Sequence, residues 1–233
     1  MSNEHLLQVI AHIHSDFPAK FGVPRQSGLI EELTASIVFE PPYRQMEAIR
    51  GLEDFSHIWL IWQFSQARRD GWSPTVRPPR LGGNIRMGVF ATRSPFRPNA
   101  IGLSSVRLTH IEQHPEFGPV LHVAGADLVD GTPIYDIKPY LPRFDSHPEA
   151  TGGFTDSLAE ELLLVDCPPA LLALLPPDRQ QALLSVLAHA PPPASQDAPP
   201  RRYGLSFAGY DVHFSVDGRQ LTVHAIQPLS PAP

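Results

Sequence analysis

The sequence predicts a mainly β protein, a barrel or a sandwich, followed by a smaller α+β module. Short β-like runs separated by Gly, Pro and Asn fill the chain before about residue 150, and few stretches there could hold a crossover helix. The chain has 27 prolines in 233 residues, and each proline removes a backbone donor, which favours many short elements. A doubly wound parallel sheet is therefore not expected in the first two-thirds.

The first part of the chain alternates expected strands with turns. The run His57–Phe64 (HIWLIWQF) is apolar on both faces, which is typical of a strand buried on both sides. The segment Gly22–Gly28 (GVPRQSG) has loop composition, and Tyr43–Ile49 favours one or two helical turns. The other expected strands are Leu7–His14, Ser36–Glu40, Met87–Thr92, Leu103–Glu112, Val120–Leu128 and Thr132–Pro139.

The character of the chain changes beyond Arg143, and we expect two domains, residues 1–147 and residues 148–233. Asp217–Gly218 separates two β-like runs and indicates a hairpin, because Asp-Gly accepts the positive φ of a tight turn. The expected elements of the second domain are a strand at Glu161–Val165, helices at Pro168–Leu175 and Pro177–His189, and hairpin strands at Tyr203–Val216 and Gln220–Ile226.

The composition indicates a folded protein in a reducing compartment. Apolar residues make up 42% of the chain and charged residues 18%, as in ordinary soluble domains. The single cysteine, Cys167, excludes an intrachain disulfide and any multi-cysteine metal cluster. The N-terminus lacks a basic region followed by an apolar one, and no apolar run is long enough to span a membrane. We expect a cytoplasmic protein without a membrane partner.

Positive charge is concentrated in one segment of an acidic chain. The net charge is −6 overall, but residues 68–107 carry +7, which leaves −13 for the rest. All cations of this segment are arginines, which favour bidentate recognition of phosphate or carboxylate. They are Arg68, Arg69, Arg77, Arg80, Arg86, Arg93, Arg97 and Arg107, beside one acid, Asp70.

The stretch Trp72–Ser104 combines five of these arginines with stiff prolines and the pair Gly82–Gly83. Its functional interpretation is a phosphate or RNA contact surface on which Trp72, Phe90 or Phe96 offers a plane for base stacking. The alternative is a solvent-exposed loop whose arginine side chains bind no ligand.

Two further patterns have a functional and a structural interpretation. The string DLVDGTP at Asp127–Pro133 places two carboxylates at a strand end, where they could accept hydrogen bonds or complement a sulfonium charge, but Asp-Gly is also a common turn. His12 and His14, near Asp16, have metal-ligand spacing on one strand face. No third ligand is placed by sequence, so we expect no metal site.

The usual nucleotide and hydrolase signatures are missing. The chain has no G-x-G-x-x-G after a strand, no Walker loop and no G-x-S-x-G elbow. Any nucleotide-like cofactor would therefore bind outside a Rossmann fold.

Six short strings follow one another along the chain. They are VPRQ at Val23–Gln26, GLEDFSH at Gly51–His57, RPPRLGGN at Arg77–Asn84, MGVFATRSPFRPN at Met87–Asn99, DLVDGTP at Asp127–Pro133, and DIKPYLP at Asp136–Pro142. In this order they resemble the TrmO family, also called TsaA-like. The resemblance implies a homodimeric methyltransferase that uses S-adenosylmethionine on a TsaA-like β-barrel at residues 1–147. It also implies the substrate, the adenosine 3′ of the anticodon in threonine tRNAs, which carries a threonylcarbamoyl group and is methylated on N6.

The resemblance also implies the cofactor contacts. Two positions depart from the family pattern, with Ser65 in place of a histidine and Ala100 in place of a proline. The implied contacts are Pro24, Arg25, Gln26, Ser65, Gln66, Arg93, Ser105, Asp127, Leu128, Val129 and Asp130.

Methyl transfer from a sulfonium needs in-line approach of the nitrogen, so positioning should dominate, and a carboxylate that accepts the N6 proton would help. Asp136 is our candidate proton acceptor, and Arg86, Arg93 and Arg97 are candidates for cofactor carboxylate or tRNA phosphate. Arg77, Arg80, Arg86 and Arg97 form the candidate tRNA contacts. The competing functions are a non-catalytic β-barrel regulator that binds a nucleotide or RNA, and a metal hydrolase that uses His12 and His14.

Overall fold

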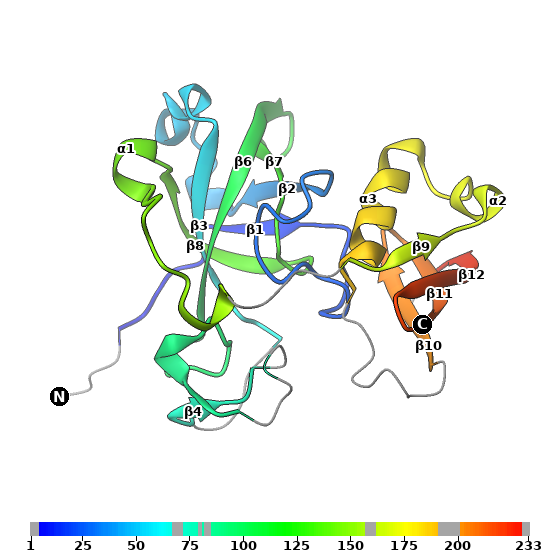
Figure 1. Cartoon of the computed structure of the whole chain (residues 1–233). Coiled ribbons are helices and arrows are strands. Elements are labelled where there is room, and N and C mark those ends of the chain that lie inside the picture. Colours follow the sequence, from blue (N-terminus) through cyan, green and yellow to red (C-terminus); the bar gives the residue numbers. More distant parts are fainter. Residues whose placement is uncertain are drawn as a thin grey trace.

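The structure is a computed structural model that describes residues 5–66, 72–78, 81, 85–156, 162–190 and 201–229. A closed β-barrel fills most of the first two-thirds of the chain, and a four-stranded sheet with helices forms the C-terminal part (Figure 1). The predicted fold class, a mainly β chain with a barrel and a smaller α+β module, is confirmed.

Six strands close the barrel in the order β1-β2-β7-β6-β3-β8. Every neighbouring pair is antiparallel, and β1 closes the ring on β8 through Ala11↔Ile134 and Ile13↔Thr132. Closure leaves no exposed sheet edge in the barrel. The strands are β1 Ala11–His14, β2 Thr34–Phe39, β3 His57–Gln63, β6 Ile101–His114, β7 Gly118–Ala124 and β8 Thr132–Pro139.

Alternation along the strands fills the barrel interior. Ile58, Leu60 and Trp62 of β3 point inward and are buried. The other face of β3, with Trp59 and Ile61, is only half-buried, so the expected burial of this strand on both sides was wrong. The β3 indole Trp59 instead donates to Asp145 Oδ2 at 3.0 Å on the outside of the barrel.

Short elements connect the barrel strands. Helical turns lie at Pro41–Tyr43, Met46–Ile49 and Leu52–Asp54 before β3, and α1 at Pro142–Asp145 follows β8. The expected strand Met87–Thr92 is extended only at β5, Met87–Gly88, which pairs with β4, Thr75–Val76, and is followed by a 3-10 turn at Val89–Ala91. We call the described residues between 72 and 100 the arginine lobe; it projects from one end of the barrel (Figure 1).

The C-terminal module has the sheet order β10-β11-β12-β9, with β9 parallel to β12 and the other pairs antiparallel. The Asp217–Gly218 hairpin is confirmed, with Gly218 at φ 55°. The single strand expected at Tyr203–Val216 was wrong, because the chain reverses at Ala208 and Gly209, both at positive φ. The elements are β9 Leu164–Asp166, α2 Pro169–Leu172, α3 Pro177–Ala188, β10 Arg201–Phe207, β11 Tyr210–Asp217 and β12 Gln220–Pro228.

The helices of the described residues are all short. None of them is long and apolar enough to cross a membrane.

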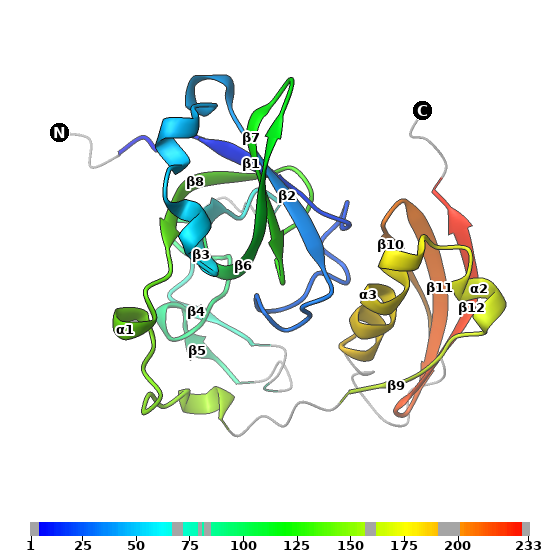
Figure 2. The same ribbon diagram turned by 90° about the horizontal axis from the view of Figure 1, so that it is seen from above.

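A loop of the barrel joins the two parts. We call residues 15–33, between β1 and β2, the bridging loop; it faces α3 (Figure 2). Phe17, Ile30 and Leu33 of this loop are buried in the same apolar cluster as α3 and the C-terminal sheet. Arg179 Nε of α3 lies 2.9 Å from Asp16 Oδ2. The C-terminal core is therefore completed by residues from near the N-terminus.

Candidate functional site

A largely buried carboxylate, Asp127, lies at the centre of the candidate site. It follows β7, and its Oδ1 accepts a 2.6 Å hydrogen bond from Ser104 Oγ of β6. Ser104 points into the barrel and is 1% exposed. Its Oγ in turn accepts a 3.0 Å hydrogen bond from Trp62 Nε1 of β3. Side chains of two barrel strands, β3 and β6, therefore fix the position of the carboxylate on the segment that follows β7.

The bridging loop closes over Asp127 at Ser27 and Gly28. The backbone N–H of Ser27 donates to the carboxylate, and Gly28 N–H donates to Gly125 O at 2.8 Å. Gly125 has φ 76°, and a Cβ built on it would lie 3.2 Å from the Gly28 backbone. Glycine allows this close approach of two backbones, so it holds the loop that carries Gln26 beside Asp127.

Arg93 of the arginine lobe meets the bridging loop at the same place. Its Nη1 donates to Gln26 Oε1, and its charge acts favourably on Asp127. Lys20 Nζ of the loop lies 5.9 Å from the ring centroid of Phe96 in the lobe. The structure thus brings Gln26, Arg93 and Asp127 together from three segments that are far apart in the sequence.

Burial raises the pKa of Asp127 above its ordinary value. The hydrogen bonds from Ser104, its own N–H and Ser27, with the charge of Arg93, oppose that rise. A carboxylate held in low dielectric attracts a cationic group more strongly than one in water. The cluster can therefore receive a ligand that carries both a positive and a negative group, with Arg93 as the partner of the negative one.

The other expected cofactor residues lie around this cluster in different settings. Pro24 is buried, whereas Arg25 and Gln26 are exposed on the loop. Ser65 and Gln66 are exposed just after β3, next to Phe64, whose N–H donates to Ala100 O at 2.9 Å.

The segment from Leu128 to Asp130 turns away from Asp127. The Leu128 side chain is 1% exposed in the barrel core, and its carbonyl accepts from Ser15 Oγ at 2.8 Å. Val129 O accepts from Thr132. Asp130 Oδ1 accepts from Ser15 N–H at 3.1 Å and lies 3.3 Å from His14 Nδ1. The two carboxylates of DLVDGTP therefore serve different neighbours.

Ser105 and Asp136 lie on the outside of the barrel. Ser105 alternates with the inward Ser104, so its side chain is on the opposite face of β6 from Asp127. Asp136 pairs with outward-facing Ile61 of β3 and lies 2.8 Å from Lys138 Nζ. Neither side chain joins the Asp127 cluster. Sequence reasoning missed Ser104 and Trp62, since the strand pairing that turns these side chains inward gives no local signal in the sequence.

Two of the candidate tRNA arginines are exposed, and one is held against the arginine lobe. Arg77 and Arg86 are exposed on the arginine lobe. Arg97 is half-buried and donates from Nη1 to Thr92 O at 2.8 Å, so it stabilises the lobe itself. Arg80 lies outside the described residues.

The histidines of β1 are each paired with a different acid. His12 Nδ1 lies 2.8 Å from Glu40 Oε1, while His14 faces Asp130. Within the described residues, no group of three or more His, Cys, Asp or Glu side chains is arranged to hold a metal ion.

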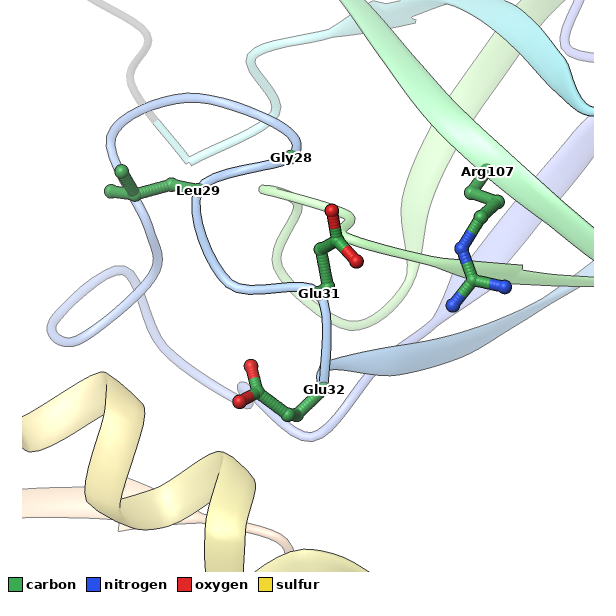
Figure 3. A pocket seen from close by; sticks show the side chains of 5 residues that line it. All are labelled: Gly28, Leu29, Glu31, Glu32 and Arg107. Atoms are coloured by element: carbon green, nitrogen blue, oxygen red, sulfur yellow. The ribbon is translucent and has the colours of Figure 1, made fainter.

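Two hollows lie beside the bridging loop. One, of about 610 Å³, is lined by Gly28, Leu29, Glu31, Glu32 and Arg107. Glu31 and Arg107 face it from opposite sides, whereas Leu29 points away (Figure 3). A second hollow, of about 580 Å³, lies between the barrel and α3 and includes Asp16, His122 and Arg179 in its lining. Neither hollow is lined by Gln26, Arg93 or Asp127.

Comparison with known proteins identifies the family of this site. The model of the tRNA-methyltransferase O N-terminal domain matches residues 12–146. The chain is 41% identical over 227 residues to the tRNA (adenine(37)-N6)-methyltransferase of Escherichia coli, covering 94% of this chain and 96% of that protein. A Pseudomonas aeruginosa protein named "Putative S-adenosylmethionine-dependent methyltransferase RcsF" is 40% identical over 227 residues, covering 90% and 92%.

A solved structure agrees over the whole chain. The crystal structure of TrmO from Pseudomonas aeruginosa is similar with a TM-score of 0.76 and 33% identity, covering 96% of this chain and 98% of that chain. Gln26, Ser104 and Asp127 all lie within residues 12–146, which the family model matches. On this combined likeness in sequence and fold, the chain belongs to the tRNA-methyltransferase O family.

Proposed function

We propose that this chain transfers a methyl group from S-adenosylmethionine to N6 of adenine 37 in tRNA. The observation that carries the proposal is the meeting of Gln26, Arg93 and Asp127 in a chain of this family. We further propose that the adenosine carries a threonylcarbamoyl group, that the tRNAs are threonine tRNAs, and that the enzyme is a cytoplasmic homodimer.

The residues of the cluster fit the chemistry of S-adenosylmethionine. Asp127 is a desolvated carboxylate at the end of a barrel strand, and Arg93 is an exposed cation beside it. A zwitterionic, sulfonium-bearing ligand presents both opposite charges. Arg93 would bind the carboxylate of the cofactor, Asp127 would complement its positive charge, and Gln26, which accepts a hydrogen bond from Arg93, would complete the contact. When bound, the cofactor supplies an electrophilic methyl group.

The protein contributes mainly by positioning. No covalent nucleophile is required, because in-line approach of the nitrogen is the main geometric demand. The Trp62–Ser104–Asp127 chain of hydrogen bonds holds the loop so that Gln26 and Arg93 keep one arrangement.

Asp136 remains our proposed proton acceptor. Its side chain is 43% exposed and is held by Lys138, so solvent and substrate can reach it. Because Asp136 lies on the outer face of β8, the target adenine must approach from that face for the carboxylate to act. Asp136 would therefore act on the adenine, whereas Asp127 would act on the cofactor.

Methyl transfer from labelled S-adenosylmethionine to purified threonine tRNA tests the proposal. We expect methylated adenosine at position 37 by nucleoside mass spectrometry, with a larger yield on tRNA that already carries the threonylcarbamoyl group. Arg93→Ala should raise the Kd for the cofactor, measured by calorimetry without tRNA, and Asp136→Asn should lower kcat without changing that Kd.

The outcomes separate the proposal from its rivals. RNA or nucleotide binding without methyl transfer would establish the non-catalytic regulator instead. Full activity in both Arg93→Ala and Asp136→Asn would overturn the residue assignments while leaving the reaction in place.

A further inference from the structure

Two large aromatic side chains stand exposed on the arginine lobe. Trp72 is 55% exposed and Phe90 is 72% exposed. Their ring centroids lie 6.2 Å apart with a tilt of 31° between the ring planes. Adjacent exposed aromatic rings are unusual on a solvated loop, since each ring keeps a wide apolar face in water. Phe96, the third aromatic side chain of the lobe, is half-buried below Lys20.

The backbone under Phe90 is firmly anchored. Phe90 lies in the 3-10 turn Val89–Ala91, next to Val89, which is 1% exposed. Val89 N–H donates to Pro74 O at 2.9 Å, and Thr92 Oγ1 donates to Val89 O at 2.9 Å. The turn therefore presents the Phe90 side chain from a backbone that is held by hydrogen bonds.

The charge around the two rings favours a nucleic acid over an apolar protein surface. The sequence has no Asp or Glu from residue 71 to residue 111. Arg77 and Arg86 are exposed on the same lobe. Arginines contact phosphates, and aromatic rings stack on unpaired bases with little preference for sequence, a combination that proteins use for single-stranded RNA.

The position of Phe90 relates it to the candidate cofactor site. Phe90 precedes Arg93 by three residues, so their Cα atoms are at most about 11 Å apart. Arg93 contacts Gln26 and acts on Asp127. A base stacked on Phe90 would therefore belong to a nucleotide close in the RNA to the one that enters the site.

We propose that Phe90, backed by Trp72, stacks on an unpaired base next to the target adenine in the anticodon loop, while Arg77 and Arg86 contact its phosphates. The inference rests on the proposed function and adds the way in which the loop is held. It assigns to the lobe a role in binding the RNA, separate from binding of the cofactor.

Binding of a synthetic anticodon stem-loop, measured by fluorescence anisotropy, tests the stacking role. Phe90→Ala should weaken binding about 5- to 150-fold, the range expected for loss of one stacked base. Phe90→Tyr should bind like the wild type, because it keeps the aromatic plane. Phe90→Leu should bind like Phe90→Ala, because it keeps the apolar character but loses the plane. The matched control is Phe144→Ala, which removes an aromatic ring that is 67% exposed on α1, outside the lobe.

A second series locates the stacked base. Each stem-loop of this series lacks the base at one position of the loop. Phe90→Ala should bind more weakly than the wild type to every stem-loop except the one that lacks the base next to the target adenine, because no stacked base remains there to be lost. Equal binding by Phe90→Ala and wild type overturns the inference, as does a Phe90→Leu variant that binds like Phe90→Tyr. A change in molecular mass of Phe90→Ala in light scattering would instead identify the rings as a contact between two copies of the chain.

The two proposals fail in different ways. If the wild type neither binds the stem-loop nor methylates tRNA, the proposed function fails and the inference fails with it. If the wild type methylates tRNA and Phe90→Ala methylates it with the same KM, only the stacking role is overturned.

Discussion

At the scale of single residues, the burial of Asp127 makes the stability of the protein depend on pH. Burial disfavours its charged form, and the pKa of the carboxyl is raised. The folded state then holds a proton over a pH range in which the unfolded chain has lost it. Stability contributed by this group is therefore present below that range and is lost as the pH rises through it.

Replacing Asp127 by Asn should remove this pH dependence. As the pH is raised from 4 to 7, the wild type should lose stability and Asp127→Asn should not, so the variant should become more stable relative to the wild type. Its binding of the cofactor should be weaker. Urea denaturation across this range measures the effect. Asp145→Asn is the control with the opposite sign, because hydrogen bonds from Leu141 N–H and Trp59 lower the pKa of Asp145. Equal slopes for both variants would contradict the assignment.

At the scale of elements, β6 connects the barrel interior to the site. Gly102 lies beneath the Trp62 indole, and a Cβ built on Gly102 would lie 2.2 Å from Trp62 Cε2. Two residues further along the same face, Ser104 links Trp62 to Asp127. The position of the Asp127 carboxylate therefore depends on the position of the Trp62 indole, because Ser104 is hydrogen-bonded to both.

Gly102→Ala should displace the indole and disturb this connection. We expect a loss of about 1–3 kcal/mol in stability from overpacking, together with weaker cofactor binding. Chemical denaturation and calorimetry measure the two effects. Leu103→Ala, on the outer face of the same strand, is the stability control and should cost less than about 0.5 kcal/mol. Unchanged cofactor affinity in Gly102→Ala would show that the indole does not position Asp127.

At the scale of the whole molecule, the C-terminal module supports the bridging loop, which carries the proposed cofactor contacts Arg25 and Gln26. Val23 and Leu29, on either side of Arg25 and Gln26, pack against the apolar core of the module. A Cβ on Gly22 would meet Leu205 Cδ1 at 2.2 Å. The module therefore contacts the bridging loop on both sides of Arg25 and Gln26. The barrel has its own apolar cluster, whereas the apolar cluster of the C-terminal module includes residues of the bridging loop, so the two parts on either side of the proposed boundary after residue 147 are packed together through that loop.

The ion pair between Arg179 of α3 and Asp16 is a polar contact between the C-terminal module and the bridging loop. Asp16 has a side chain only 15% exposed, and burial raises the pKa of Asp16 while Arg179 lowers it. Arg179→Ala should lose about 1–3 kcal/mol at pH 7 because a buried carboxylate is left unpaired. The loss should shrink as the pH falls, since protonation removes the uncompensated charge.

Urea denaturation at pH 7 and pH 4.5 measures this change. Asp178→Ala is the matched control: Asp178 also contacts Arg179, at 3.0 Å, but its side chain is 69% exposed and its removal should cost little. A loss in Arg179→Ala that is the same at both pH values would contradict the role of Asp16.

The sequence predicts the class of this fold better than its connections. Alternating runs such as Thr132–Pro139 identify strands, because the period of side-chain burial is local. The turn at Ala208–Gly209 carries no such signal, since alanine seldom adopts φ 50°. Ser105 is predicted by the family resemblance alone, and whether Ser104 or Ser105 points into the barrel depends on which face of β6 is inside. That face is decided by strand pairing, which is not visible in one strand alone.

The bridging loop also has a consequence for synthesis on the ribosome. The barrel can close once β8 has emerged, since β1 pairs with residues 132–134. Phe17, Ile30 and Leu33 then have no complete core to enter until α3 and the strands β10, β11 and β12 follow. A growing chain with a finished barrel therefore carries an uncovered apolar surface through the synthesis of its last third, an interval in which chaperones or neighbouring chains can bind it.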